Sequence, residues 1–127
     1  MSRQVIATPH APAAVGPYSQ AIRSGNLVFT AGQIGLDPAT GKLAEGLENQ
    51  AEQVMKNLRA VLAAAGTSLD QAIKTTIFLA DMADFAQVNA IYGRAFSVTP
   101  PARSTVQVAG LPLGGLVEIE VIALVED

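Results

Sequence analysis

Residues 47–66 read LENQAEQVMKNLRAVLAAAG, and this stretch decides the fold. Apolar side chains recur in it at steps of three and four positions, the spacing that brings residues to one face of an α-helix. Gly66 follows the last of them, and glycine often ends a helix because it adopts a positive φ without strain. The stretch predicts a long amphipathic helix whose buried face consists of Leu47, Ala51, Val54, Leu58, Val61, Leu62 and Ala65.

The segments before and after this helix have the composition and spacing of β-strands. Before it, we expect strands over 4–7, 20–24 and 27–33, the last two joined by the two-residue turn Gly25-Asn26. Residues 37–41 read as a turn before the helix begins. After it, strands are expected over 73–79, 102–108 and 116–124.

A second helix is expected between the strands over 73–79 and 102–108. Asp81 or Asp84 is placed to cap its first turn, and Pro100-Pro101 would stop it. Its buried stripe is expected to contain Phe85, Val88, Tyr92, Ala95 and Phe96. The order β-β-β-α-β-α-β-β predicts an α+β fold with two helices on one face of a mixed sheet.

Length and composition indicate one domain over residues 1–127 that associates with copies of itself. The chain is 50% hydrophobic, with eleven glycines besides, and only 15% charged. Because so short a chain has much surface for its volume, we expect part of the apolar surface to be buried between subunits. A monomer with a large core is the alternative.

Charge and residue usage exclude several classes of function. The net charge is −3 and no run of basic residues occurs, which argues against binding nucleic acid. The chain has no cysteine and only one histidine, so no thiol chemistry, zinc–thiolate site or other metal site is expected. His10 reads as a solvated residue of a proline-rich loop. No secretory or membrane signal is found, and we predict a cytoplasmic protein.

Arg103 stands out because it interrupts a segment that otherwise reads as a buried strand. An arginine keeps its charge, so its head must reach water or meet an anion. Glu118 and Glu120, on the last predicted strand, could form a structural ion pair with it, or the cation could bind a small acid. If the last two strands formed a tight hairpin, Arg103 would lie near Ala123 and far from Glu118. Direct pairing within one chain is therefore disfavoured, and contact across a subunit boundary is open.

Short motifs along nearly the whole chain occur in the order and spacing of one known family. The chain resembles the reactive intermediate deaminase A (RidA) family, also labelled YjgF, YER057c and UK114. The resemblance rests on Gly16-Pro17-Tyr18-Ser19-Gln20-Ala21, Ala31-Gly32-Gln33-Ile34-Gly35, Lys74-Thr75-Thr76-Ile77-Phe78-Leu79, Asp84-Phe85 with Asn89 and Tyr92, Pro101-Ala102-Arg103-Ser104 and Glu118-Ile119-Glu120.

The resemblance implies a fold, an assembly and an activity. The implied fold is chorismate-mutase-like, in a homotrimer whose sheets line a central barrel and whose three clefts lie between subunits. The implied activity is that of a 2-iminobutanoate/2-iminopropanoate deaminase, which hydrolyses imines and enamines such as 2-aminoacrylate to 2-keto acids and ammonia. No cofactor and no metal are implied.

Two residues would carry the chemistry of that activity. A 2-imino acid has a carboxylate beside its reacting carbon, and Arg103 could hold this group through two parallel hydrogen bonds. By resemblance, Glu118 would orient the attacking water and accept its proton. The alternatives are a purely structural ion pair for Arg103 and a barrel-facing ion pair for Glu118. Glu120 is expected to be structural.

Other residues of the site come from the resemblance alone. Tyr18 would close the cleft, the backbone around Gly32 and Thr105 would donate hydrogen bonds to the ligand, and Asn89 would form a polar wall. The alternatives are a packing role for Tyr18 and a helix-to-loop hydrogen bond for Asn89. Ala31 occupies a position where the family often has serine, which could alter the substrate range.

Two other functions remain open for such a chain. One is a non-catalytic trimer that binds 2-keto acids at the same cleft, as a metabolic sensor or a chaperone-like protein. This protein would need Arg103 but not Glu118. The other is the ribonuclease activity ascribed to some relatives, against which the acidic pI and the lack of a second histidine argue.

Overall fold

The predicted long helix is present as α1, Gly46–Ala64, in the computed structural model, which describes residues 2–126. Gly66 has a φ of +83°, and its N–H donates to the Ala63 carbonyl at 3.0 Å. The Thr67 N–H donates to the Leu62 carbonyl at 2.9 Å, which completes a two-bond helix ending. The expected C-terminal role of Gly66 is confirmed.

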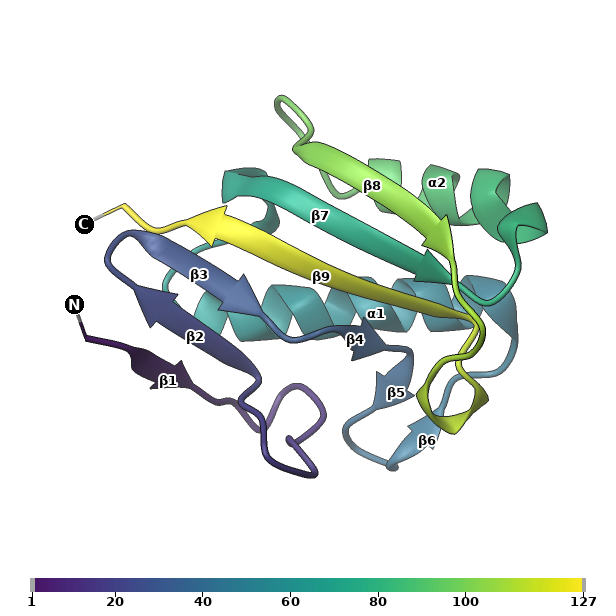
Figure 1. The fold of residues 1–127 in the computed structure, drawn as a ribbon, viewed down its shortest axis with the longest axis horizontal. Coiled ribbons are helices and arrows are strands. Elements are labelled where there is room, and N and C mark those ends of the chain that lie inside the picture. The colour runs from purple at the N-terminus through teal and green to yellow at the C-terminus, as the bar shows by residue number, and fades with distance from the viewer. Residues whose placement is uncertain (1, 127) are drawn as a thin grey trace.

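Nearly all strands belong to one seven-stranded mixed sheet, and both helices cover the same face of it (Figure 1). Its order is β1-β2-β3-β9-β7-β8, with β4 also paired to β9. Among the strand pairs of residues 2–126, only β7–β8 is parallel. The strands are β1 (Gln4–Ile6), β2 (Ala21–Ser24), β3 (Leu27–Thr30), β4 (Gln33–Ile34), β7 (Ala72–Leu79), β8 (Ala102–Gln107) and β9 (Val117–Leu124).

The remaining elements are short and were not predicted. A separate hairpin is formed by β5 (Leu36–Asp37) and β6 (Lys42–Leu43). The described part of the chain also contains three 3₁₀ turns, η1 (Leu69–Gln71), η2 (Met82–Asp84) and η3 (Pro112–Gly114). The expected strands and helices otherwise follow one another in the predicted order.

The strand expected over 27–33 is two strands, because the chain bulges between them. Phe29 pairs with Ile122, and Gln33 pairs with Ile119. The chain therefore advances four residues from Phe29 to Gln33 while β9 advances only three, which leaves one extra residue in the bulge. The Val121 N–H donates to the Thr30 hydroxyl at 3.0 Å, which bridges the bulge. The bulge places Gly32 against the side chain of Glu118, whereas the Ala31 N–H still bonds to the Gln20 carbonyl beside β2.

The assumption that the last two strands form a hairpin is wrong. In the structure β7 lies between β8 and β9, and β8 runs parallel to β7. The reason is that α2 connects β7 to β8, and a helical crossover returns the chain in the same direction. Arg103 therefore pairs with Thr75 on β7, and not with any residue of β9.

The second helix is shorter than the sequence suggests. α2 spans Phe85–Gly93 and ends well before Pro100. Asp81 caps the preceding turn η2, where its carboxylate accepts the Ala83 N–H at 2.9 Å. Glycine is a poor helix former, which accounts for the end of α2 at Gly93. Ala95 and Phe96 still pack against the core from beyond the helix.

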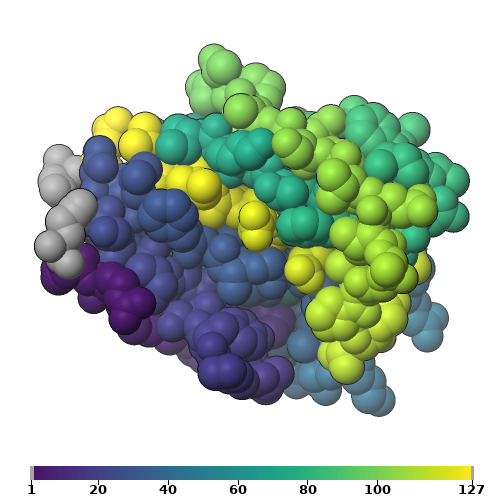
Figure 2. Space-filling view, viewed as in Figure 1, coloured from purple at the N-terminus to yellow at the C-terminus, as the bar shows by residue number. Residues whose placement is uncertain are grey.

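The other face of the sheet is not covered by any helix among the described residues. Figures 1 and 2 look onto this face, and side chains of the strands form its surface. Phe29 and Val106 lie on it and are each 41% exposed. Exposed apolar side chains on an open sheet face are typical of a surface that another molecule covers. No helix within residues 2–126 is long and apolar enough to span a membrane.

Candidate active site

The side chain of Arg103 projects from β8 toward α2, on the helix-covered face of the sheet. Its Nη1 donates to Asn89 Oδ1 at 2.6 Å. Its Cζ lies 5.4 Å from the ring centre of Phe85 and 5.2 Å from that of Tyr92. The cation is therefore held by α2 through an amide and two aromatic rings.

No carboxylate within residues 2–126 forms an ion pair with Arg103. Thr105, two positions further along β8, faces the same way. Its hydroxyl is buried and has no hydrogen-bond partner in the described part of the chain. A guanidinium without a counter-ion beside an unpaired hydroxyl is suited to bind a small anion. We call Arg103, Thr105, Asn89 and Phe85 the arginine half.

Glu118 lies on β9 and faces the helix-free side. Its carboxylate packs against Gly32, at the bulge after β3. A Cβ at Gly32 would stand 2.5 Å from Glu118 Oε1 and 2.8 Å from Cδ, so only glycine allows this approach. Both residues line a cavity of about 280 Å³ together with Tyr18. We call Glu118, Gly32 and Tyr18 the glutamate half.

The glutamate-half cavity is largely apolar apart from this carboxylate, with walls from Pro12, Ala13, Val15, Ile34, Leu36, Pro112 and Leu113. Burial raises the pKa of Glu118 above its ordinary value of 4.5, and the like charge of Glu120 raises it further. A carboxylate with a raised pKa accepts a proton more readily than an exposed one, which suits a general base. No cluster of three or more potential metal ligands occurs in residues 2–126.

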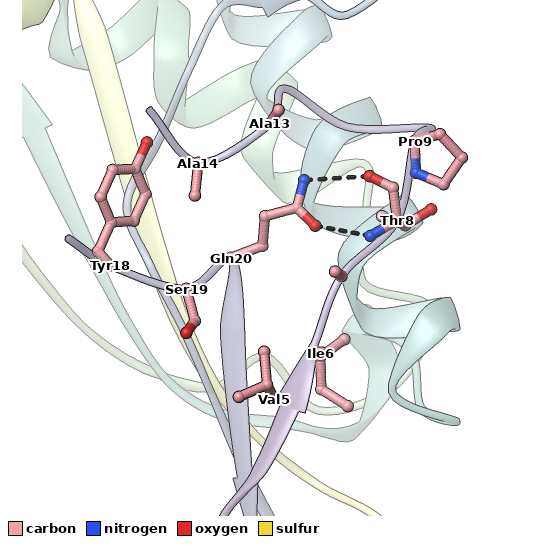
Figure 3. A pocket seen from close by; sticks show the side chains of 10 residues that line it. Val5, Ile6, Thr8, Pro9, Ala13, Ala14, Tyr18, Ser19 and Gln20 are labelled. Atoms are coloured by element: carbon pink, nitrogen blue, oxygen red, sulfur yellow. Dashed lines mark hydrogen bonds between the residues drawn. The ribbon is translucent and has the colours of Figure 1, made fainter. Parts of the chain in front are cut away.

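The loop that carries Tyr18 is held in place by the buried side chain of Gln20. The Gln20 amide oxygen accepts the Thr8 N–H at 2.7 Å, and its nitrogen donates to the carbonyls of Thr8, Ala11 and Pro12 at 3.1, 3.3 and 2.7 Å. Figure 3 shows the paired bonds to Thr8 beside a cavity of about 370 Å³ that Tyr18 also lines. The sequence alone does not predict this role of Gln20. The signal available in the sequence was a polar residue at the start of the strand expected over 20–24.

The structure thus brings the predicted site residues together in two groups rather than one. Arg103 and Glu118 lie on opposite faces of the sheet, because Arg103 pairs with Thr75 and Glu118 pairs with Phe78, three positions further along β7. Ala31 belongs to neither group. It lies in the bulge, does not line the glutamate-half cavity, and donates its N–H to the Gln20 carbonyl at 2.9 Å.

Comparison with known proteins places the chain in a family. A family model described as Endoribonuclease L-PSP matches residues 8–125. Reactive Intermediate Deaminase A, chloroplastic, of Arabidopsis thaliana is 53% identical over 124 residues, which cover 97% of this chain and 66% of that protein. This chain belongs to the RidA family. Among other members, the 2-iminobutanoate/2-iminopropanoate deaminase of Mus musculus is 50% identical over 96% of this chain and 91% of its own length.

Solved structures of the RidA family share the fold. RidA from an Antarctic Psychrobacter has a TM-score of 0.94 at 50% identity, with 96% of this chain and 99% of that chain covered. Escherichia coli TdcF, determined with bound serine, has a TM-score of 0.93 at 41% identity, with 97% of this chain and 99% of that chain covered. The α+β architecture with two helices and a mostly antiparallel sheet is therefore that of RidA proteins.

Proposed function

We propose that this chain is an enamine/imine deaminase that hydrolyses 2-imino acids to 2-keto acids and ammonia. The observation that carries the proposal is the Arg103 guanidinium, which α2 holds in place without a carboxylate partner in the described part of the chain. A cation held in this way is available to the carboxylate of a substrate. Two relatives named as 2-iminobutanoate/2-iminopropanoate deaminases, from mouse and cattle, support the choice of substrate.

Each residue of the site has a defined part in this reaction. Arg103 binds the substrate carboxylate through charge-assisted hydrogen bonds and fixes the position of the adjacent C=N carbon. Glu118 orients a water molecule and accepts its proton as the oxygen attacks that carbon. Glu118 passes this proton to the imine nitrogen, which gives the neutral carbinolamine. The carbinolamine C–N bond then breaks as the hydroxyl proton is transferred to the nitrogen, so that imine and water together become keto acid and ammonia. No redox change occurs.

Smaller contributions come from the other predicted residues. Thr105 offers its unpaired hydroxyl and its backbone to the ligand, beside Arg103. Gly32 leaves room for the Glu118 carboxylate, and Tyr18 covers the glutamate-half cavity. General-base assistance contributes roughly 10²–10⁴-fold. That is enough for a substrate that already hydrolyses in water.

The two halves complete one site only when copies of the chain associate. Arg103 and Glu118 face opposite sides of the same sheet, so a ligand bound to both must lie between two chains. We propose a homotrimer of chorismate-mutase-like subunits, in which the helix-free sheet faces cover one another and each cleft combines the arginine half of one subunit with the glutamate half of the next. The exposed Phe29 and Val106 on the open face support this assembly. The cytosol is the proposed compartment.

A bound ligand in a relative supports the class of molecule. TdcF was determined with serine, which carries a carboxylate and an adjacent nitrogen as a 2-imino acid does. The experiment that tests the function generates 2-iminobutanoate from threonine in situ and follows 2-ketobutanoate release. We expect acceleration by the parent protein and not by Arg103→Ala. Equal, uncatalysed rates for both would refute the deaminase. Keto-acid binding without hydrolysis would favour the non-catalytic sensor instead.

A further inference from the structure

Three residues of α2 contact the guanidinium of Arg103, and all three lie on one face of the helix. Phe85, Asn89 and Tyr92 occupy positions i, i+4 and i+7, a spacing that aligns side chains along an α-helix. The two rings lie 5.4 and 5.2 Å from Arg103 Cζ, and the Asn89 oxygen lies 2.6 Å from its Nη1. The sequence pattern suggested only that Phe85 and Tyr92 are core residues.

The ring of Tyr92 is itself fixed by the strand next to Arg103. Its hydroxyl lies 2.6 Å from the hydroxyl of Thr75, and both side chains are buried. Thr75 is the residue on β7 that pairs with Arg103 on β8. The ring also packs against Phe96, with centroids 4.8 Å apart. The strand pair that carries Arg103 therefore sets the position of the ring below its guanidinium.

Aromatic rings hold a cation without neutralising it. A guanidinium has five N–H donors, and Asn89 uses one of them here. The ring faces attract the positive charge and take up none of the in-plane donors. An aspartate or glutamate in their place would occupy the edge that a substrate carboxylate needs and would compete with it. An arginine without these contacts would lose side-chain freedom on binding, which weakens affinity.

We propose that Tyr92 is a positioning residue that, with Phe85 and Asn89, holds Arg103 in the orientation that receives the substrate carboxylate. This inference rests on the proposed function and extends it to a residue outside the two halves. Tyr92 acts on binding rather than on the attack of water. Its loss should raise KM and the Kd for a keto acid while kcat changes little, the signature of lost uniform binding.

The test compares Tyr92→Leu, Tyr92→Phe and Phe85→Leu with the parent protein. Ile91→Val is the matched control, because Ile91 is a buried neighbour on α2 that is not among the residues contacting Arg103. The measurements are the Kd for 2-ketobutanoate by calorimetry, KM and kcat for in situ 2-iminobutanoate, and thermal unfolding. If Tyr92→Leu folds poorly, Phe85→Leu still tests whether the aromatic contacts to Arg103 affect binding. Phe85 is 38% exposed, so its replacement disturbs the core less.

We expect Tyr92→Leu to raise Kd and KM about tenfold and Phe85→Leu to raise them about fivefold. Tyr92→Phe should remain within about twofold of the parent, because the ring contacts the cation and its packing against Phe96 keeps it in place without the hydroxyl. Ile91→Val should match the parent. The positioning role of Tyr92 is refuted if both leucine variants bind as the parent does, if Tyr92→Phe binds as weakly as Tyr92→Leu, or if kcat falls while KM is unchanged. Failure of the parent to accelerate hydrolysis would count against the proposed function itself.

Discussion

Arg103 and Glu118 lie on opposite faces of one sheet and are separated by the whole width of β7. Thr75, the partner of Arg103, has its side chain among the helices, whereas Phe78, the partner of Glu118, faces the open side. A single chain therefore cannot direct both side chains at one small ligand. This relationship makes association of copies a requirement of the proposed chemistry.

Removing the guanidinium should remove most of the acceleration without unfolding the protein. Arg103→Ala is expected to lower kcat/KM about 100-fold, because charge-assisted bonds to a carboxylate are lost. Arg103→Lys should be intermediate, since an ammonium keeps the charge but not the paired donors. In situ imine hydrolysis measures both. Arg59→Ala, which removes an exposed arginine on α1, is the control. Activity of Arg103→Ala close to that of the parent would mean that another group binds the substrate.

Adding a single methyl group at Gly32 should disable the glutamate half. In Gly32→Ala the new Cβ would stand 2.5 Å from Glu118 Oε1, so the carboxylate must move away. We expect kcat to fall at least about tenfold, because a displaced base no longer reaches its water. Gly110→Ala is the matched control, since nothing lies within 4 Å of a Cβ there. A crystal structure of Gly32→Ala with Glu118 unmoved, together with low activity, would contradict this explanation.

The loss of activity at low pH should follow the protonation of the Glu118 carboxylate. Burial and the charge of Glu120 hold its pKa above 4.5, so kcat/KM is expected to fall as pH decreases through a midpoint above that value. Glu120→Gln removes the like charge, lowers the Glu118 pKa and should move the midpoint to lower pH. Glu48→Gln, an exposed change on α1, should leave it in place. A midpoint that Glu120→Gln does not move would argue against Glu118 as the titrating group.

The same carboxylate should destabilise the fold at neutral pH. Because its pKa is raised in the folded protein, the proton is bound more tightly there than in the unfolded chain. Its contribution to stability is therefore present below the ordinary pKa and is lost as pH rises through the folded value. Glu118→Gln should raise Tm at pH 7 and have little effect on Tm below pH 4.5, as thermal unfolding at matched protein concentration would detect. A lower Tm at pH 7 would mean that the ionised form is stabilised by a partner.

Gln20 should be required for the loop that carries Tyr18. Its side chain is 4% exposed and bonds to the backbone of Thr8, Ala11 and Pro12. Gln20→Leu is expected to lower the free energy of unfolding by about 2 kcal/mol, because buried backbone groups lose their partners. Urea unfolding measures the change, and Gln87→Leu, at an exposed position of α2, is the control. An unchanged free energy of unfolding would mean that water replaces the amide without loss.

The spacing of apolar and polar residues along the chain predicted much of the fold. The features that it did not predict depend on which strands pair with one another. The spacing of apolar residues over 47–66 predicted α1, and Gly66 predicted its end. The alternation along β8 and β9 correctly grouped Arg103 with Thr105, and Glu118 with Glu120. That alternation does not reveal that β7 separates the two strands, so the sequence could not show that these polar faces point in opposite directions.

Residues whose roles depend on contacts between distant segments could not be assigned from the sequence. The bulge before β4 depends on register against β9, and Gly32 has its role only because Glu118 packs there. Tyr92 fitted a core stripe, and only the structure places its ring against Arg103. Each of these contacts joins segments whose proximity depends on the order of strands in the sheet, which periodicity does not encode.

The most direct test of the central claim mixes two inactive variants. Arg103→Ala and Glu118→Ala would be unfolded together in equal amounts, refolded, and assayed for imine hydrolysis. If each site joins the arginine half of one copy to the glutamate half of the next, about one quarter of the sites should be intact, and about that share of parent activity should return. Each variant refolded alone should stay inactive. A mixture no more active than the separate variants, at a stoichiometry shown to include mixed assemblies, would contradict a site shared between copies.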